Sequence, residues 1–232
     1  MVLVLFLGEE YLMKLTLVAA TGATGRLVLE QASAAGHEVT AVVRSPGKLP
    51  SGVGAVRADL SRPDPGVLAS AVAGADAVVS ALGATSKAEA GVAATGTRAL
   101  IAAMRAAGTR RLVVLSAAPI GTVPTAARPD KPRHDPGDGF LLRRLTPIVK
   151  RALAAHYADL AAMEDAVVDS GLDWTIVRPP QLTDKPAAGR WRTQVGHNPR
   201  NGFTIARADL AAAMLAAVSD PAAVRRVLGV AY

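Results

Sequence analysis

Residues 15–26 read LTLVAATGATGR, and this stretch decides the fold class. Its first half is a continuous apolar run, which is typical of a strand buried on both faces of a sheet. Gly22 and Gly25 follow at once, and the pattern beyond them predicts a helix over residues 27–35. Glycines allow a tight turn and a close backbone approach, while the first N–H groups of a helix bind anions. The stretch therefore predicts a site for a nucleotide diphosphate in an α/β domain.

Strands and helices alternate along most of the chain. The sequence predicts further strands at 38–43, 53–57, 76–82, 111–116, 173–177 and 226–230, and helices at 65–73, 92–107, 140–149, 151–170 and 208–218. Pro147 is expected to break the helical region between 140 and 170. Residues 178–204 are expected to be irregular, with short strands at 191–195 and 203–205. The alternation predicts a doubly wound parallel sheet of Rossmann type, with a small C-terminal cap on the substrate side.

The length of 232 residues suits one domain. We expect residues 1–12 to be an N-terminal extension and residues 13–232 to form a single Rossmann domain. Five prolines between 119 and 136 indicate a long loop, so we expect a lid over 118–150. A substrate loop is expected over 178–206.

Composition and charge exclude several classes of protein. The chain has no Cys, and its four His are scattered, so we expect neither a metal site nor a thiol nucleophile. No apolar run reaches the roughly 18–20 residues that span a bilayer, so we expect no membrane partner and a cytoplasmic location. The net charge of +7 is concentrated in two blocks, +4 over 128–151 and +5 over 185–207, around −5 over 152–184. Such blocks, with few aromatic residues, are not typical of a nucleic-acid surface, and the sequence leaves monomer and homodimer open.

The predicted turn supplies the first set of cofactor-binding residues. They are Gly22, Ala23, Thr24, Gly25, Arg26 and Leu27. A third glycine is usual three residues after Gly25, and this chain has Val28 there. Val28 is expected to displace the helix slightly or to be accommodated by small neighbours such as Ala19.

Cations follow the second predicted strand, where an NAD site usually has an acid for the ribose hydroxyl. Arg44, with Arg26 and Lys48, is expected to bind a 2′-phosphate, because guanidinium pairs with phosphate oxygens. The sequence therefore predicts NADP(H) in preference to NAD(H), the alternative being that Arg44 is a solvated surface charge. Further cofactor contacts are expected at Asp59 and Leu60, near the adenine, and at Ala81, Leu82 and Gly83, near the second ribose.

The segments TGATGR, VVRSPGKL, ADL, DAVVSALG, RLVVLSA and SGLDWTIVRPPQLTD together resemble the atypical short-chain dehydrogenases. Within these the chain looks like the NAD(P)H-binding group that includes biliverdin and flavin reductases and NmrA-like proteins. The resemblance covers residues 14–232 and implies a Rossmann sheet that binds NADP. It also implies hydride transfer to a flavin or quinone-like acceptor, or cofactor binding without turnover, and it places Pro179 and Pro180 beside the nicotinamide.

The candidate catalytic residues are Ser116, Tyr157 and His156. Ordinary short-chain dehydrogenases have a Lys four residues after the Tyr, which lowers the pKa of the phenol. Here that position is Ala161, which argues against an alcohol dehydrogenase mechanism, and Tyr157 can instead be a packing residue. A flat conjugated acceptor needs less help, because the protein mainly orients it against the nicotinamide.

Other side chains have both a functional and a structural interpretation. Trp191 is a candidate for stacking on the acceptor, whereas Trp174 is expected in the core. Asp159 and Glu164 are expected on a solvated helix face. Basic residues of the two blocks could attract an anionic acceptor such as flavin mononucleotide or could be plain surface charges; they include Arg143, Arg144, Arg190 and Arg192.

The leading hypothesis is an NADPH-dependent reductase that acts on a small-molecule acceptor, such as a flavin or a quinone. The first alternative is a non-catalytic NADP(H)-binding sensor of NmrA type, and the second is an epimerase-like enzyme.

Overall fold

The computed structural model describes residues 12–84, 86 and 89–232. The expected extension therefore lies almost wholly outside the described residues. The helices are α1 (Ala23–Ala34), α2 (Pro65–Val72), α3 (Val92–Ala107), α4 (Phe140–Ala152), α5 (Ala154–Val168) and α6 (Arg207–Ser219). The strands are β1 (Lys14–Val18), β2 (Glu38–Val43), β3 (Gly54–Arg57), β4 (Ala77–Ser80), β5 (Arg111–Leu115), β6 (Asp173–Arg178), β7 (Gln181–Thr183), β8 (Arg192–Val195), β9 (Thr204–Ala206) and β10 (Arg226–Ala231).

One main sheet has the strand order β3-β2-β1-β4-β5-β6-β10-β8. Its neighbouring strands are parallel, except that the edge strand β8 runs antiparallel to β10. The order reverses at β1, which lies between β2 and β4 with Leu17 opposite both Ala41 and Val79. This doubly wound parallel sheet confirms the predicted fold class, and β7 and β9 form a small second sheet.

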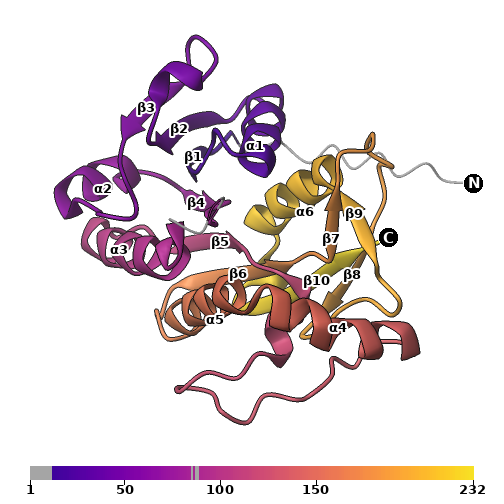
Figure 1. Ribbon diagram of the computed structural model, residues 1–232. Helices are drawn as coiled ribbons and strands as arrows, with labels where there is room; N and C mark the ends of the chain where they lie inside the picture. The colour runs from indigo at the N-terminus through magenta and orange to yellow at the C-terminus, as the bar shows by residue number, and fades with distance from the viewer. Residues whose placement is uncertain (1–11, 85, 87–88) are drawn as a thin grey trace, which may run out of the picture.

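Helices cover both faces of the main sheet (Figure 1). One face packs on α2, α3 and α5, and its core includes Leu112 and Ile176, which are fully buried. The other face packs on α1 and α6, and its core includes Leu17 and Met214. The apolar strands are thus buried on both faces, as their continuous hydrophobic runs predict.

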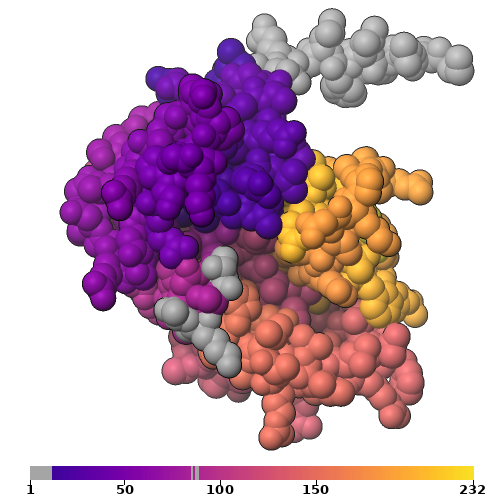
Figure 2. Space-filling model, turned by 45° about the horizontal axis from the view of Figure 1, so that its top comes forward, coloured from indigo at the N-terminus to yellow at the C-terminus, as the bar shows by residue number. Residues whose placement is uncertain are grey.

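The carboxyl ends of β1, β4, β5 and β6 lie at one edge of the sheet. The strand order reverses between β1 and β4, and α/β proteins bind ligands at the carboxyl ends of the strands beside such a reversal. Figure 2 shows a recess at this edge, between the N-terminal elements in indigo and purple and the C-terminal segments in orange and yellow.

Two local predictions were wrong. Pro147 does not break a helix, because α4 continues through it to Ala152, and the break before α5 is at Leu153, where φ is −110° and ψ is 24°. Every residue of α4 is at least partly exposed, so water can solvate the carbonyl group that proline leaves without a partner. The strand β7 was missed because its three residues follow directly after two prolines.

No helix among the described residues is long and apolar enough to cross a membrane.

Candidate functional site

The turn after β1 has the geometry of an anion-binding site. Gly22 N–H donates to the Ala19 carbonyl over 3.0 Å, which folds the chain back sharply before α1 begins. Gly22 is the N-terminal cap of α1, and no side chain accepts a hydrogen bond there. The first N–H groups of α1 are therefore left for a ligand, together with the positive end of the helix dipole.

Gly25 is required by the close approach of α1 to β1. A Cβ atom built on Gly25 would lie 2.2 Å from the Ala19 carbonyl oxygen and 2.9 Å from the Ala19 carbonyl carbon. Ala19 itself has a φ of +61°, which is unusual for a residue other than glycine. Val28, in the position of the missing third glycine, is buried in the same core cluster as Ala20 and Ala41, so the N–H groups of α1 stay in place.

A cavity of about 480 Å³, which we call the β1–β4 cavity, opens beside this turn. Its lining residues lie at the carboxyl ends of β1, β2, β3 and β4, and they include many of the residues predicted to bind a cofactor. These are Gly22, Arg44, Lys48, Asp59, Leu60, Leu82 and Gly83.

Two sets of polar contacts connect residues that line the β1–β4 cavity. Asp59 Oδ1 accepts hydrogen bonds from the hydroxyl group and the backbone N–H of Ser61, and these bonds lower the pKa of Asp59. The Nη1 atom of Arg44 lies 2.6 Å from Oε1 of Glu89. Sequence reasoning missed Glu89, because a single acid between two helices carries no signal.

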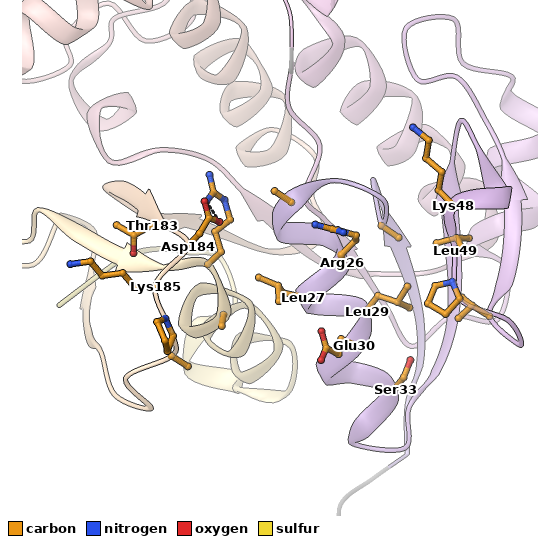
Figure 3. Close-up of a pocket in the computed structure, with 18 of the residues that line it drawn as sticks. Arg26, Leu27, Leu29, Glu30, Ser33, Lys48, Leu49, Thr183, Asp184 and Lys185 are labelled. Atoms are coloured by element: carbon orange, nitrogen blue, oxygen red, sulfur yellow. Dashed lines mark hydrogen bonds and ion pairs between the residues drawn. The ribbon is translucent and has the colours of Figure 1, made fainter.

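Arg26, the third predicted phosphate ligand, lies on the outer side of the turn. It lines a larger hollow of about 1000 Å³ between α1, the segment after β2 and the segment after β7 (Figure 3). Lys48 lines both this hollow and the β1–β4 cavity. Within the hollow, Arg207 forms an ion pair with Asp184, as the dashed line in Figure 3 shows.

The candidate catalytic residues line a second cavity of about 240 Å³, which we call the β5–β6 cavity. Ser116 follows β5, His156 and Tyr157 project from α5, and Pro179 and Pro180 follow β6. Ala81, Leu82 and Gly83 close the cavity on the β4 side. Leu82 and Gly83 line both this and the β1–β4 cavity, so one extended ligand can reach both.

Ser116 belongs to a buried polar network rather than being a free hydroxyl group. Its Oγ donates to Glu164 Oε1 over 2.6 Å, and Arg178 Nε donates to the same oxygen over 2.8 Å. All three residues are more than nine-tenths buried. The Glu164 carboxylate is therefore satisfied by an ion pair and a hydroxyl group, as a buried charge must be.

Glu164 and Asp159 were both predicted on a solvated helix face, and this was wrong. Asp159 is buried and accepts hydrogen bonds from the backbone N–H groups of Gly91, Ala93 and Ala94 over 2.8–3.1 Å. These groups are the free donors at the start of α3, which its own glycine cap leaves without a side-chain acceptor. The two acids point inward because each has a buried partner that lies far from it in sequence.

Tyr157 is 7% exposed, and burial raises the pKa of its phenol. The dehydrogenase mechanism with a Tyr–Lys pair needs the opposite shift. The His156 ring lies 5.9 Å from the Tyr157 ring, measured between centroids. Trp174 is 8% exposed and lies in the core as predicted, whereas Trp191 packs against the second core cluster and lines neither cavity at the strand ends.

A third cavity, of about 370 Å³, continues from the β5–β6 cavity toward the predicted lid, and we call it the lid cavity. The two cavities share Tyr157 and both prolines, Pro179 and Pro180. Most other lining groups of the lid cavity are apolar, among them Leu142, Leu145 and Phe203.

Two buried acids, which the sequence did not single out, also line the lid cavity. Asp135 Oδ1 accepts from the N–H groups of Gly137 and Asn198, and Asp138 Oδ2 accepts from Asp135 N–H. Burial is the main cause that raises the pKa of Asp138. The Oδ1 atom of Asn198, which lines the same cavity, has no hydrogen-bond partner among the described residues.

The basic residues of the two blocks do not line this cavity or the β5–β6 cavity. Arg143 donates to the backbone oxygen of Asp138, and the Arg144 guanidinium lies over the Phe140 ring at 4.8 Å. Arg192 donates to the backbone oxygen of Arg200. The idea that these cations hold an anionic acceptor inside the cavity therefore gains no support from the geometry.

Fold and site together define a Rossmann protein with a glycine turn at a helix N-terminus and an adjoining apolar cavity. Residues 19–221 match the model of the NAD(P)H-binding family, and the chain belongs to this family. This confirms the resemblance seen in the sequence.

Three solved structures are similar over almost the whole chain. A proposed exported protein from Burkholderia pseudomallei is 30% identical, with a TM-score of 0.69, over 95% of this chain and 100% of that one. The anaerobillin reductase ChuY from Escherichia coli O157:H7 is 23% identical, with a TM-score of 0.73, over 94% and 96%. SP1627 from Streptococcus pneumoniae TIGR4, proposed to be an NADH-flavin reductase, is 22% identical, with a TM-score of 0.70, over 94% and 99%.

Proposed function

We propose that this protein is an NADPH-dependent reductase of a flat conjugated acceptor. The observation that carries the proposal is the chain of connected cavities at the carboxyl edge of the sheet. The β1–β4 cavity lies beside the anion-binding turn, and the β5–β6 and lid cavities continue from it. The names of two structural neighbours, an anaerobillin reductase and a proposed NADH-flavin reductase, agree with this class of reaction.

The residues present fit a dinucleotide. Because Gly25 has no Cβ, α1 begins close to the Ala19 carbonyl, and the Gly22 cap leaves the first N–H groups of α1 for the diphosphate. The nicotinamide end would lie in the β5–β6 cavity, against Pro179 and Pro180 and beside Ala81. When bound there, NADPH supplies the hydride.

The side chains around the β5–β6 cavity would orient the rings and exclude water. Apolar walls and two rigid prolines make a slot in which an acceptor ring can lie flat. Tyr157, with a raised pKa, keeps its proton and can donate a hydrogen bond to an acceptor oxygen. Ser116 cannot donate there while its proton is shared with Glu164.

The preference for NADPH over NADH is a separate part of the proposal. Arg44 and Lys48 line the adenosine side, and Arg26 lies across the turn from Lys48. We infer that a 2′-phosphate binds near Lys48 and takes Arg44 away from Glu89. Phosphate is the stronger partner because it carries more charge than one carboxylate.

Dissociation constants for NADPH and NADH test this preference. Arg44→Ala should weaken NADPH binding about 10–100-fold, the usual loss for a charge-assisted hydrogen bond, and should leave NADH binding unchanged. Arg98→Ala, on the exposed side of α3, is the matched control. Equal affinities of the wild type for the two cofactors would refute the preference.

The acceptor is expected to be an uncharged ring system, such as a quinone or the isoalloxazine of a flavin. The lid cavity is largely apolar and no Lys or Arg of the described residues lines it, so a phosphate group inside it would lack a cationic partner. Steady-state NADPH oxidation with a panel of quinones, riboflavin and flavin mononucleotide tests the reaction. Turnover of at least one uncharged ring supports the proposal.

One observation favours a second function, a cofactor-binding sensor without turnover. Tyr157 has no lysine four residues on, and Ser116 is held by Glu164, so no proton donor of the usual dehydrogenase type is assembled. Tight NADPH binding with no oxidation by any acceptor of the panel would establish the sensor and refute the reductase. Nothing in the geometry favours the epimerase-like alternative. We place either function in the cytoplasm, where the NADPH pool is available.

A further inference from the structure

Helix α4 presents an apolar surface that none of the described residues covers. Phe140 is 75% exposed, Ile148 67% and Leu141 55%, and no residue of the helix is buried. Leu141, Leu145 and Ile148 follow one another at intervals of four and three residues, so they lie on one face. Figure 1 shows α4 on the outside of the molecule, with its start extending away from the sheet. Exposed apolar patches of this kind mark interaction sites.

The other face of α4 is strongly basic. Arg143, Arg144, Lys150 and Arg151 recur at intervals of seven, and residues 139–158 contain no acid. Arg144 lies over the Phe140 ring, while Arg143 and Lys150 donate to the backbone oxygens of Asp138 and Thr122. An apolar face with Leu and Ile, flanked by Phe and by a face rich in Lys and Arg, is the pattern of a helix that lies in a membrane interface.

The second basic block meets α4 in space. Asn201 N–H donates to the Gly137 carbonyl over 3.2 Å, which places the loop around Arg200 next to the start of α4. Phe203 in this loop is 41% exposed and lines the lid cavity. Two blocks that are separated by residues 152–184 in sequence thus form one basic and apolar surface. We call it the α4 surface, and it consists of Phe140, Leu141, Arg143, Arg144, Leu145, Ile148, Val149, Lys150, Arg151, Arg200 and Phe203.

The α4 surface is continuous with the lid cavity. Leu145 is 44% exposed and also lines the cavity, as does Leu142 from the same helix. If an apolar phase covers α4, an apolar molecule can therefore pass from that phase into the lid cavity without crossing water.

We propose that the α4 surface docks on an anionic lipid bilayer, and that the acceptor is an apolar conjugated ring dissolved in that bilayer. The second half rests on the proposed reductase function; the first does not. The charge of the α4 surface identifies its partner, because its cations complement acidic headgroups while its apolar residues enter the acyl region. The sequence expectation of no membrane partner was based on spanning segments, and this surface exists only once the two blocks are brought together.

A second copy of the chain fits the α4 surface less well. A two-fold contact would pair the patch with itself and bring two sets of like charges together. The acids that flank α4 in sequence offer no compensation, because Asp138 and Asp159 are both buried.

Co-sedimentation with lipid vesicles tests the docking. The full chain should bind vesicles of phosphatidylcholine mixed with phosphatidylglycerol at least about tenfold more strongly than vesicles of phosphatidylcholine alone, and added salt should weaken the binding. Arg144→Glu/Arg151→Glu should lose this binding through charge, and Leu141→Ser/Ile148→Ser through apolar contact. Arg57→Glu/Arg98→Glu changes the net charge equally on exposed residues of β3 and α3, and it should bind like the wild type.

Several results would overturn the docking. If Arg57→Glu/Arg98→Glu loses as much vesicle binding as Arg144→Glu/Arg151→Glu, the vesicles attract the protein through its net charge alone. Binding that survives both α4 variants and is lost in Leu5→Glu/Phe6→Glu would assign it to the apolar run at residues 2–7. Self-association that Leu141→Ser/Ile148→Ser abolishes, without any vesicle binding by the wild type, would assign the surface to a second copy.

Turnover tests the acceptor. With anionic vesicles present, the α4 variants should reduce a long-chain quinone dissolved in the bilayer about tenfold more slowly than the wild type, and a short-chain soluble quinone equally fast. Equal rates of wild type and variants with both quinones would refute delivery from the bilayer. If the wild type binds vesicles but reduces neither quinone nor any other acceptor of the panel, the reductase function fails while the docking stands.

Discussion

Gly25 is the residue on which the nucleotide-binding turn most depends. Its missing side chain lets α1 begin within van der Waals reach of the Ala19 carbonyl. Because a Cβ would lie 2.2 Å from this oxygen, any larger residue must push the helix away from the strand. The sequence predicted a glycine turn between strand and helix, but it assigned the close packing of the helix on the strand to the third glycine position, which is Val28.

Gly25→Ala should weaken NADPH binding more than about tenfold, because the N–H groups that hold the diphosphate move. Isothermal titration calorimetry measures the affinity, and circular dichroism checks the fold. Gly47→Ala is the matched control, since a Cβ there meets nothing within 4 Å. Unchanged affinity in Gly25→Ala would show that the turn does not hold the cofactor.

Asp138 makes stability depend on pH. Burial raises the pKa of this carboxyl, so the folded state holds its proton more tightly than the unfolded state does. The folded state is therefore penalised as the pH rises from the ordinary pKa of aspartate to the raised pKa of the folded protein. Asp138→Asn, which can still accept from Asp135 N–H, should be more stable than the wild type at neutral pH.

Urea unfolding at several pH values between 4 and 8 measures this difference. The gain in the free energy of unfolding for Asp138→Asn should grow with pH and vanish toward pH 4. Asp130→Asn, in the same proline-rich loop but exposed, is the control and should show no such dependence. A gain that is the same at every pH would contradict the assigned cause.

At the scale of elements, α3 shows how tertiary contacts complete a helix. Its N-terminal cap is Gly91, with a φ of +88° and no side chain to accept a hydrogen bond. The acceptor is Asp159, which α5 supplies from 65–68 residues further along the chain. Sequence rules for caps look one to three residues away, so they could not find this contact.

Asp159→Ala should therefore destabilise the protein by about 2 kcal/mol, because it removes a cap and leaves buried N–H groups unpaired. Asp64→Ala removes the exposed local cap of α2 and should cost about 1 kcal/mol. Chemical denaturation of both variants gives the comparison. A smaller loss for Asp159→Ala than for Asp64→Ala would mean that the buried cap contributes little.

At the scale of the whole molecule, the proposed cofactor site joins the two halves of the sheet. Its cavities are lined by residues after β1 to β4 on one side and after β5 and β6 on the other. A dinucleotide that spans them should stabilise both halves together.

Saturating NADPH should raise the melting temperature as one cooperative transition. At a hundredfold excess over the dissociation constant the gain is about 2.7 kcal/mol, or about 5–10 °C for a chain of this size. Differential scanning calorimetry measures it, with 2′-phospho-ADP-ribose as the comparison ligand that lacks the nicotinamide. A transition that splits into two, with only the first one shifted, would show that the site lies in one half alone.

The sequence by itself determined the parallel sheet, the glycine turn after its first strand and the family. These follow from local patterns: apolar runs, glycine spacing and the caps that end helices. Tertiary structure alone decided which polar residues are buried, because Glu164, Asp159 and Asp135 are each paired with groups that no local pattern relates to them. It also decided where the positive charge lies on the surface. Only the folded chain brings the loop around Arg200 beside α4, with the lid cavity between them.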